Sequence, residues 1–202
     1  MKELINIENW KRKGQYSFFK DFEEPFYGVC VTIDCTEAYK KAKAQQCSFF
    51  LYYLHRSLMA VNAIENFRYR IENHNVYLYD RIDASTTVDK PDGTFGMSDG
   101  IVFCPDFEVF EAEATQEMER VRRSNELSPS CGNNVIHYSA IPWINFTSLS
   151  HARRFSGQDS SPKISFGKIT EENGKRSMPV SIHVHHALGD GLHIGQFVEK
   201  FQ

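Results

Sequence analysis

Histidine is concentrated near the end of the chain, where four of the eight histidines fall within residues 183–193. Side chains alternate along a strand, so His183 and His185 would face one side of a sheet and His186 the other. Asp190, followed by a glycine, predicts a turn directly after that strand. Because imidazole takes up and releases a proton near neutral pH, the segment predicts a site that presents a histidine for proton transfer.

Three interpretations of these histidines are open on spacing alone. His183 and His185 could offer two metal ligands from one strand face, although neither a cysteine nor a second carboxylate stands close by. The histidines could instead be buried, with their nitrogens satisfied by hydrogen bonds. In the third interpretation, His186 is a general base with Asp190 nearby.

The strands that would position this segment are predicted where β-branched and aromatic residues are dense or alternate with polar ones. They cover 27–33, 67–71, 76–79, 135–146, 164–169 and 178–184. Two hairpin turns are expected, at 72–75 and at 171–175, and the second contains the Asn-Gly pair typical of a tight hairpin.

Helices are predicted where apolar positions recur every three or four residues. They cover 36–46 with Thr36 as N-cap, 48–63 with Ser48 as N-cap, 107–123 and 193–201, with a short helical segment within 9–19. Residues 89–100 and 127–134 are expected to be loops. Helices and strands mix without regular alternation and no linker divides them, so we expect one domain over residues 1–202 with an α+β fold.

The charge balance excludes a protein that holds nucleic acid or acidic membranes by bulk electrostatics. Lys and Arg number 23 against 26 Asp and Glu, a net charge of −3. The longest apolar run, Phe49 to Leu54, is far shorter than the ~20 residues of a membrane helix, and no signal-peptide core is visible. Five cysteines without a CxxC pair favour free thiols. We therefore expect a cytoplasmic protein without nucleic-acid or membrane partners.

Four segments, in order, resemble one enzyme family. HHALGDGLH at 185–193 resembles the HHxxxDGxH signature of the chloramphenicol acetyltransferases, and its HxxxDG core also occurs in lipoyl-dependent acyltransferases. NWKRK at 9–13 resembles the family's N-terminal NWxRR or NWxRK segment, PWINFTS at 142–148 its PWxxFxS strand, and SFGK at 165–168 its TxxK strand. The resemblance spans essentially the whole chain.

The resemblance implies both a fold and a reaction. The expected fold is a two-layer sandwich of a mixed β-sheet with helices, assembled as a homotrimer with active sites between subunits. The expected reaction is O-acetyl transfer from acetyl-CoA, the co-substrate, to a hydroxyl of chloramphenicol in a ternary complex, with no metal. The sequence contains no Gly-x-Ser-x-Gly elbow, which agrees with a mechanism that forms no acyl-enzyme.

The resemblance also assigns roles to individual residues. His186 is the implied catalytic base, with its tautomer held by its own main-chain carbonyl. Ser148 would donate a hydrogen bond to the tetrahedral oxyanion. Arg12 and Asp190 would form an ion pair that fixes the turn carrying His186.

Further correspondences concern substrate binding. Lys168 matches a position on the coenzyme A side, and Ser165 matches one that orients the reacting groups through water. Phe95 would be an aromatic residue of the acceptor pocket. Trp143 is expected in the core.

Three positions depart from the family's pattern. His183 stands where glutamine is usual, Leu192 where an aromatic residue is usual, and Ile169 where tyrosine is common. Two alternatives are therefore kept: a related acetyltransferase with another hydroxylated acceptor, or a non-enzymatic ligand- or metal-binding module on the same scaffold. A lipoyl-dependent acyltransferase core is disfavoured, because neither a lipoyl domain nor its linker is visible.

Overall fold

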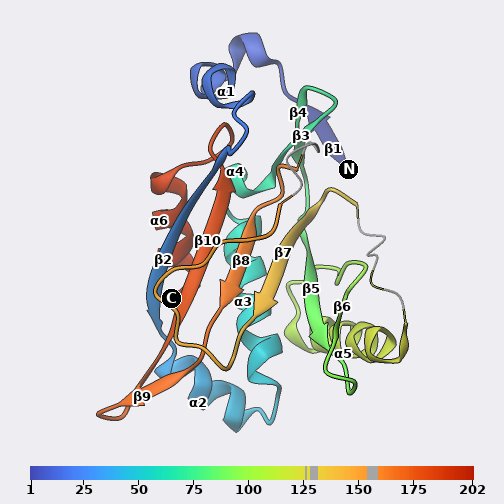
Figure 1. The fold of residues 1–202 in the computed structure, drawn as a ribbon, viewed down its shortest axis with the longest axis vertical. Coiled ribbons are helices and arrows are strands. Elements are labelled where there is room, and N and C mark those ends of the chain that lie inside the picture. The colour runs from blue at the N-terminus through green and yellow to red at the C-terminus, as the bar shows by residue number, and fades with distance from the viewer. Residues whose placement is uncertain (126, 128–131, 154–158) are drawn as a thin grey trace.

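The computed structural model describes residues 1–125, 127, 132–153 and 159–202. Within these residues the main feature is a seven-stranded sheet with the order β2-β10-β8-β7-β5-β6, and β9 pairs with β10 off this path (Figure 1). The strands are β2 (Phe26–Asp34), β5 (Asp83–Asp89), β6 (Phe95–Met97), β7 (Val135–Ala140), β8 (Lys163–Phe166), β9 (Thr170–Glu172) and β10 (Lys175–His185).

Strand directions make this sheet a mixed one. β5, β7 and β8 run parallel to one another. β10 is antiparallel to the two strands that flank it, β2 and β8. The predicted α+β class with a mixed sheet is therefore confirmed.

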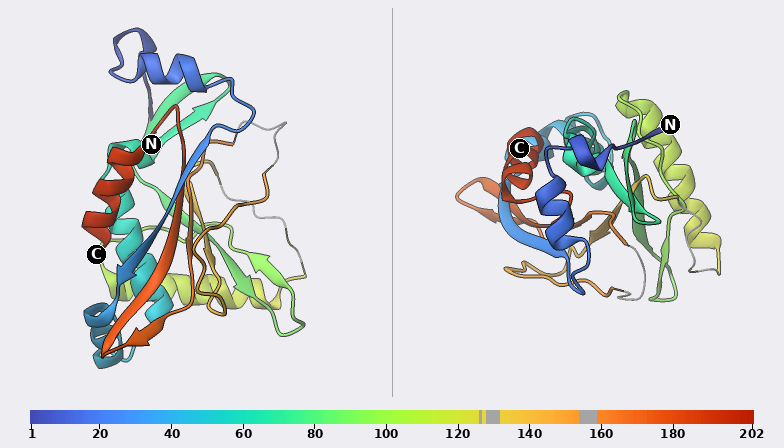
Figure 2. Two further views of the ribbon diagram at one scale, coloured as in Figure 1. Left: turned by 60° about the vertical axis from the view of Figure 1, so that its left-hand side comes forward. Right: turned by 90° about the horizontal axis from the view of Figure 1, so that it is seen from above.

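Helices form the second layer of the sandwich and cover one face of the sheet (Figure 2). They are α2 (Thr36–Ala44), α3 (Phe49–Asn62) and α6 (Gly191–Phe201), while α5 (Phe107–Arg123) packs against α3, β5 and β6. The core lies between the two layers, where Leu54, Leu58, Ile182 and Phe197 are fully buried. Helix α3 buries Leu54 and Leu58 together because residues four apart lie on one helix face.

Alternation along β10 sorts its side chains between the two faces of the sheet. Val180, Ile182 and Val184 belong to the core cluster beneath the helices. The residues between them, among them Ser181 and His183, face the other way. The strand that ends at the histidine motif is thus fixed by apolar burial on one face, and its other face is free to carry polar side chains.

The chain that follows β7 crosses this other face of the sheet, in front of β2 and β10 (Figure 1). Two backbone hydrogen bonds of 2.8 Å tie its start to the end of β8: the Ile141 N–H donates to the Phe166 carbonyl, and the Lys168 N–H donates to the Ile144 carbonyl. The polar residues beneath are consequently shielded from solvent.

A second, three-stranded sheet supports the histidine motif from the N-terminal side. Its order is β1-β4-β3. The elements of this part are β1 (Lys2–Leu4), η1 (Ile7–Asn9), α1 (Lys13–Phe19), α4 (Glu65–Arg68), β3 (Tyr69–Glu72) and β4 (Asn75–Tyr79). Tyr16, Tyr69 and Val76 form a buried cluster with Ala187 and Leu188 of the motif. Through this cluster the turn after β10 packs against the first residues of the chain.

Two predicted strands are too long. β7 ends at Ala140 rather than at 146, because Pro142 has no N–H for a ladder and a turn begins there. β8 ends at Phe166, and the predicted hairpin instead joins β9 to β10. Its turn residues Asn173 and Gly174 have φ of 51° and 76°, as a tight Asn-Gly hairpin requires.

The predicted helix caps have different outcomes. Ser48 caps α3 as predicted, since its side chain accepts the Leu51 N–H. The prediction for Thr36 is wrong: Cys35 holds the cap position of α2, and the Thr36 hydroxyl accepts the Arg176 N–H at 2.8 Å instead. The hydrogen bond with Arg176 of β10 thus outweighs the local preference of threonine for the N-cap position.

Two predicted segments have a different secondary structure in the protein, and a third lies partly outside the described residues. The loop predicted over 89–100 contains the short strand β6, and residues 67–68 belong to α4 rather than to a strand. The loop predicted over 127–134 lies partly outside the described residues.

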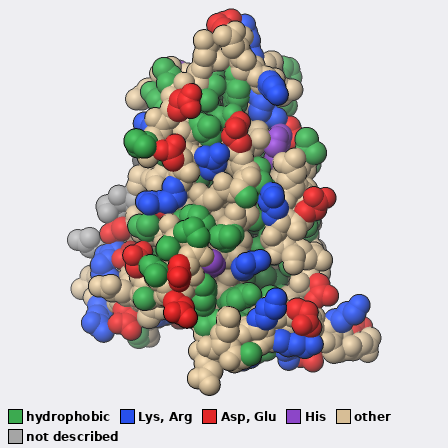
Figure 3. Space-filling view, turned by 180° about the vertical axis from the view of Figure 1, so that it is seen from behind, with side chains coloured by type: hydrophobic (Ala, Val, Ile, Leu, Met, Phe, Trp, Pro, Cys, Tyr) green, Lys and Arg blue, Asp and Glu red, His purple; other side chains and the backbone are tan. Residues whose placement is uncertain are grey.

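Charged side chains of both signs are interspersed on the face opposite to the view of Figure 1 (Figure 3). This mixture fits the small net charge of −3. Among the described residues, no helix has both the length and the apolar character needed to cross a bilayer.

Candidate active site

The histidine motif spans the end of β10, a tight turn and the start of α6. Asp190 is the N-cap of α6, and its side chain accepts the Leu192 N–H at 3.1 Å. His193 completes a capping box, because its Nδ1 accepts the Asp190 N–H at 3.2 Å. Burial lowers the pKa of His193, which favours the neutral ring that can accept this bond. Both bonds fix Asp190, where the turn ends, to the first residues of α6.

His186 lies in this turn with its imidazole between two aromatic rings. The Phe19 ring stacks on one side, with centroids 4.1 Å apart and planes at 19°. The Tyr27 ring stacks at 5.0 Å and 28°. The backbone N–H of His186 donates to the Pro25 carbonyl at 2.7 Å. The ring is thus confined by residues of α1 and β2 that are far away in sequence.

The tautomer of His186 is set by a carbonyl of the turn. Nδ1 lies 3.2 Å from the carbonyl oxygen of Gly189, an arrangement in which Nδ1 carries the proton and Nε2 keeps its lone pair. The expectation that His186 uses its own carbonyl is wrong, because Nδ1 faces the Gly189 carbonyl instead. The His186 carbonyl accepts a hydrogen bond from Arg12 at 3.2 Å. Either carbonyl leaves Nε2 as the basic nitrogen.

Arg12 connects the first residues of the chain to this turn. Its Nη1 donates to Asp190 Oδ2 at 2.8 Å, which is the expected ion pair. Its other nitrogens donate to the carbonyls of His186 and Ala187, at 3.2 and 3.4 Å. Burial opposes ionisation of Asp190, but the hydrogen bond from Arg12 keeps the pKa of this carboxyl below its usual value.

Ser148 lies in the loop after β7, not in the strand that was expected for PWINFTS. Its side chain is exposed and, within the described chain, makes no hydrogen bond. None of the described contacts joins it to His186. The structure therefore brings Arg12, His186 and Asp190 together, and leaves Ser148 apart from them within a single chain.

The remaining predicted positions are also separate from the motif. Ser165 on β8 is fully buried, and its Oγ has no partner in the described part of the chain. Lys168 is exposed beyond the end of β8. Phe95 is 53% exposed on β6, at the opposite edge of the sheet from β2. Trp143, expected in the core, is 74% exposed in the turn after Pro142, so that prediction is wrong.

Two further histidines, His137 and His183, belong to a polar group on the face of the sheet away from the helices. His137, Lys163, His183 and Gly28 are successive cross-strand neighbours from β7 to β2. Burial and the nearby Lys163 lower the pKa of His137 to about 4. Lys163 itself is buried, and it pairs with Asp159. This row is charged mainly by Lys163, and its histidines are neutral near pH 7.

His185 fits the interpretation of a buried, satisfied histidine. Its Nδ1 accepts the Ala187 N–H at 3.3 Å, and burial lowers its pKa to about 4. No group of three or more His, Cys, Asp or Glu in the described chain could hold a metal ion. The geometry of the motif thus presents His186, and not His185, for proton transfer.

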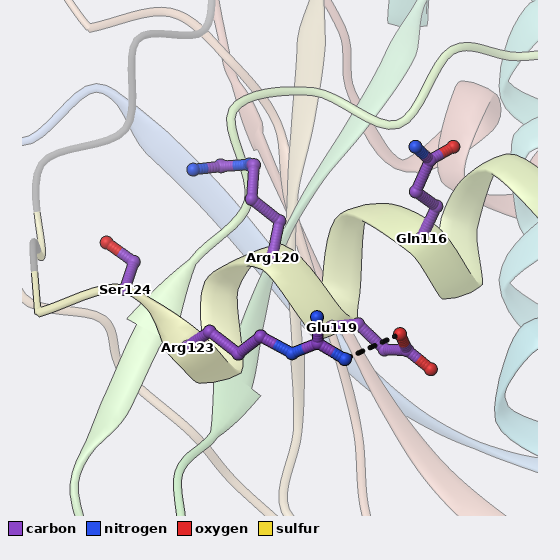
Figure 4. Close-up of a pocket in the computed structure, with 5 residues that line it drawn as sticks. All are labelled: Gln116, Glu119, Arg120, Arg123 and Ser124. Atoms are coloured by element: carbon purple, nitrogen blue, oxygen red, sulfur yellow. Dashed lines mark hydrogen bonds and ion pairs between the residues drawn. The ribbon is translucent and has the colours of Figure 1, made fainter.

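A hollow of about 470 Å³ opens elsewhere, at the end of α5. Figure 4 shows its lining, in which Arg123 pairs with Glu119 beside Gln116, Arg120 and Ser124. These side chains are polar and contribute no acid or base of the histidine motif. The hollow therefore adds nothing to the candidate site.

Phe19 and Tyr27, whose rings flank His186, are not among the predicted site residues. Aromatic residues are dense along 10–22, but no spacing rule pairs residue 19 with residue 186. The only available signal is the density of aromatic residues before β2, which composition alone cannot assign to a site.

The fold and the histidine-bearing turn define an acyltransferase. The chain belongs to the chloramphenicol acetyltransferase family, whose model matches residues 2–202. This membership favours an enzyme over a non-enzymatic binding module.

Individual relatives are similar over nearly their whole length. The chain is 24% identical over 201 residues to chloramphenicol acetyltransferase 3 of Escherichia coli, covering 98% of this chain and 94% of the relative. It is 28% identical over 195 residues to a chloramphenicol acetyltransferase of Bacillus pumilus, covering 95% and 88%. A solved chloramphenicol acetyltransferase has a TM-score of 0.91 at 33% identity, covering 100% and 98%.

A more distant neighbour is the cubic core of the pyruvate dehydrogenase multienzyme complex, with a TM-score of 0.68 at 13% identity, covering 98% of this chain and 88% of that one. At this level of identity the likeness extends to the fold alone.

Proposed function

We propose that the protein transfers an acetyl group from acetyl-CoA to a hydroxyl of chloramphenicol, with His186 as general base. One observation carries this proposal: the His186 imidazole is confined between two rings, and its Nδ1 faces the Gly189 carbonyl. Nε2 is thereby left with a lone pair and a fixed direction. A base of this kind suits a reaction in which a hydroxyl must lose a proton at neutral pH.

The proposed chemistry follows from these positions. Nε2 of His186 takes the proton of the acceptor hydroxyl while the oxygen attacks the thioester carbonyl carbon. The carbonyl π electrons move to oxygen, and the resulting oxyanion accepts a hydrogen bond from the Ser148 hydroxyl. When the C–S bond breaks, the imidazolium returns the proton to the coenzyme A thiolate. The reaction needs neither a metal ion nor an acyl-enzyme.

Arg12 and Asp190 are proposed as the structural support of this base. Arg12 holds the carbonyls of His186 and Ala187 as well as the Asp190 carboxylate. A turn fixed at three points limits the directions in which the imidazole can swing. Both residues are thus expected to act through the position of His186 and not by contact with substrate.

We further propose a homotrimer whose sites lie between subunits. Ser148 is exposed and separate from His186 within one chain, while Phe95 is exposed at the sheet edge far from β2. A neighbouring subunit could bring Ser148 to His186, and Phe95 to the acceptor. Ser165 and Lys168 are proposed on the side of the oxyanion and of coenzyme A. We also propose a single domain over residues 1–202 and a cytoplasmic location.

A second candidate keeps the reaction but changes the acceptor. Leu192, in place of an aromatic residue, is 67% exposed beside Asp190. His183 replaces a glutamine and is buried on β10. Because both differences leave the base and its support intact, another hydroxylated acceptor is the alternative that they favour.

Thiol release from acetyl-CoA, measured with and without chloramphenicol, tests the proposal. We expect release that depends on the drug in the wild-type protein and none in a folded His186→Ala variant. Drug-dependent release by that variant would remove His186 from the mechanism. If the wild-type protein releases thiol only with other hydroxylated compounds, the alternative acceptor is correct.

A further inference from the structure

The loop that carries Ser148 is held on its N-terminal side by the chain after β8. Besides the hydrogen bond between Lys168 and Ile144, the Phe146 ring packs against Gly167, as does Pro179 of β10. A Cβ at position 167 would lie 2.9 Å from both the Phe146 ring and the Ile144 carbonyl. This first anchor lies two residues before Ser148.

A second anchor lies three residues after Ser148. The His151 ring packs edge to face on the His183 ring of β10, with centroids 5.0 Å apart and planes at 88°. Two residues later, Arg153 pairs with Glu24. Between the two anchors, Ser148 makes no hydrogen bond within the described chain, so its place depends on how firmly the flanking residues are held.

We propose that the ring contact between His151 and His183 positions the loop that carries the oxyanion donor, which makes both histidines positioning residues for acetyl transfer. The proposal rests on the proposed function for Ser148. It also gives a role to His183, the residue that departs from the family's usual glutamine.

His183 is a rigid platform for this contact. Its side chain is only 8% exposed, and its Nδ1 lies 3.2 Å from the Ser181 hydroxyl. The ring lies over Gly28 on β2, where an added Cβ would stand 2.3 Å from the imidazole. Because Gly28 has no side chain, the His183 ring can occupy the space above it.

The contact joins two rings without a hydrogen bond between them. Nε2 of His151 is buried and has no partner in the described chain. Burial, together with His183, lowers the pKa of His151 to about 4. The other groups acting on the pair are Lys163, Arg153 and His137, which all disfavour a further positive charge, and Glu24, which favours one on His183. Both rings are therefore neutral near pH 7, and a phenyl ring can replace one of them.

The experiment compares His151→Ala with His151→Phe, with the exposed neighbour Ser150→Ala as a matched control. Each variant is made in the wild-type and in the Ser148→Ala background. We expect His151→Ala to lower kcat about tenfold, with little change in either KM, because a misplaced donor affects the transition state most. His151→Phe and Ser150→Ala should keep the wild-type kcat.

The double variant decides whether the effect passes through Ser148. In the Ser148→Ala background, His151→Ala should cause no further loss, since the hydroxyl that it positions is already gone. An equal loss in both backgrounds would overturn the proposal, as would a His151→Phe enzyme as slow as His151→Ala. If His151→Ala does not fold, His183→Ala removes the same contact from the other side and takes its place in the cycle.

Amide hydrogen exchange gives a readout that does not depend on activity. Peptides covering 145–151 should exchange faster in His151→Ala than in the wild-type protein or in Ser150→Ala. Unchanged exchange would overturn the proposal even if kcat falls. A wild-type protein inactive on every acceptor would defeat the proposed function, while the exchange result would still decide whether the histidine contact holds the loop.

Discussion

The ring of Phe19 stacks on the imidazole of His186, with centroids 4.1 Å apart and planes within 19° of parallel. Phe19 ends helix α1, and His186 follows the last strand of the sheet. The N-terminal helix therefore forms one wall of the slot that holds the proposed base, and Tyr27 forms the other. The orientation of His186 consequently depends on how α1 docks.

Removing the Phe19 ring should impair catalysis more than binding. Phe19→Ala opens one side of the slot, so His186 can leave the direction set by Gly189. We expect kcat to fall about tenfold with smaller changes in KM, as for a misplaced catalytic group. Steady-state kinetics on a folded variant check this. Phe19→Tyr keeps the stacked ring and should remain close to wild type, and a Phe19→Ala enzyme with unchanged kcat would contradict the role.

Loss of the Ser148 hydroxyl should slow the reaction without weakening substrate binding. Ser148→Ala should lower kcat by about 10²–10³, the usual effect of losing one oxyanion donor, with a modest change in KM. A rise in KM alone would identify Ser148 as a ground-state binding residue.

The same variant tests the shared site. If Ser148 serves the His186 of another subunit, mixed assemblies of inactive His186→Ala and Ser148→Ala chains contain some intact sites. Denaturing and reassembling the two together should restore part of the activity, and light scattering should give a mass near three times 23.3 kDa. A monomeric mass, or no rescue despite demonstrated subunit exchange, would rule out the shared site.

Substitutions of Arg12 and Asp190 should each lower the activity, and their effects should not be additive. Arg12→Ala and Asp190→Asn each break the 2.8 Å ion pair that fixes the turn. Once one partner is gone, removing the other costs less, so the double variant should lose less than the product of the two single losses. A double-mutant cycle in kcat/KM measures this coupling. Strictly multiplicative losses would show that the two side chains act independently.

Stability should fall as the pH is lowered from about 6.5 towards 4. In the folded protein His137, His151 and His185 have pKa values lowered to about 4, mainly by burial. Over this window the unfolded chain binds more protons than the folded one, so protonation favours unfolding, by at most about 1.4 kcal/mol per pH unit for each group. Urea unfolding followed by fluorescence at pH 7, 6 and 5 measures the trend.

The contribution of these three buried histidines to the pH dependence can be tested with one substitution. His137→Asn removes one of the three groups and should make the dependence on pH shallower. A wild-type stability that does not change between pH 7 and 5 would contradict the pKa values of all three histidines.

Regular spacing and short motifs predicted the parts of the fold that local chemistry decides. Helix α5 has the predicted bounds, because its apolar spacing, its acidic start and its basic end all act within one helix. The Asn173-Gly174 turn follows from the positive φ that these residues tolerate. The expected pair of Arg12 with Asp190 came from motifs at the two ends of the chain, not from spacing.

Distant contacts decided the features that the sequence did not reveal. Thr36 bonds to Arg176 instead of capping its helix, and β6 exists because it pairs with β5. Phe19 meets His186 only after α1 has docked against the turn. No local pattern encodes such partners, since residues far apart in sequence meet only when the sheet is complete.

Strand β10 lies between β2 and β8 in the sheet and is also its last strand to leave the ribosome. While the chain is being made, β2 on one side and β8 on the other have no partner between them, and such unpaired edges favour aggregation. The ion pair between Arg12 and Asp190 likewise cannot form until almost the whole chain has been translated. A chain released before β10 is complete therefore has neither a continuous sheet nor the proposed base, and chaperones and proteases act on it before any activity can arise.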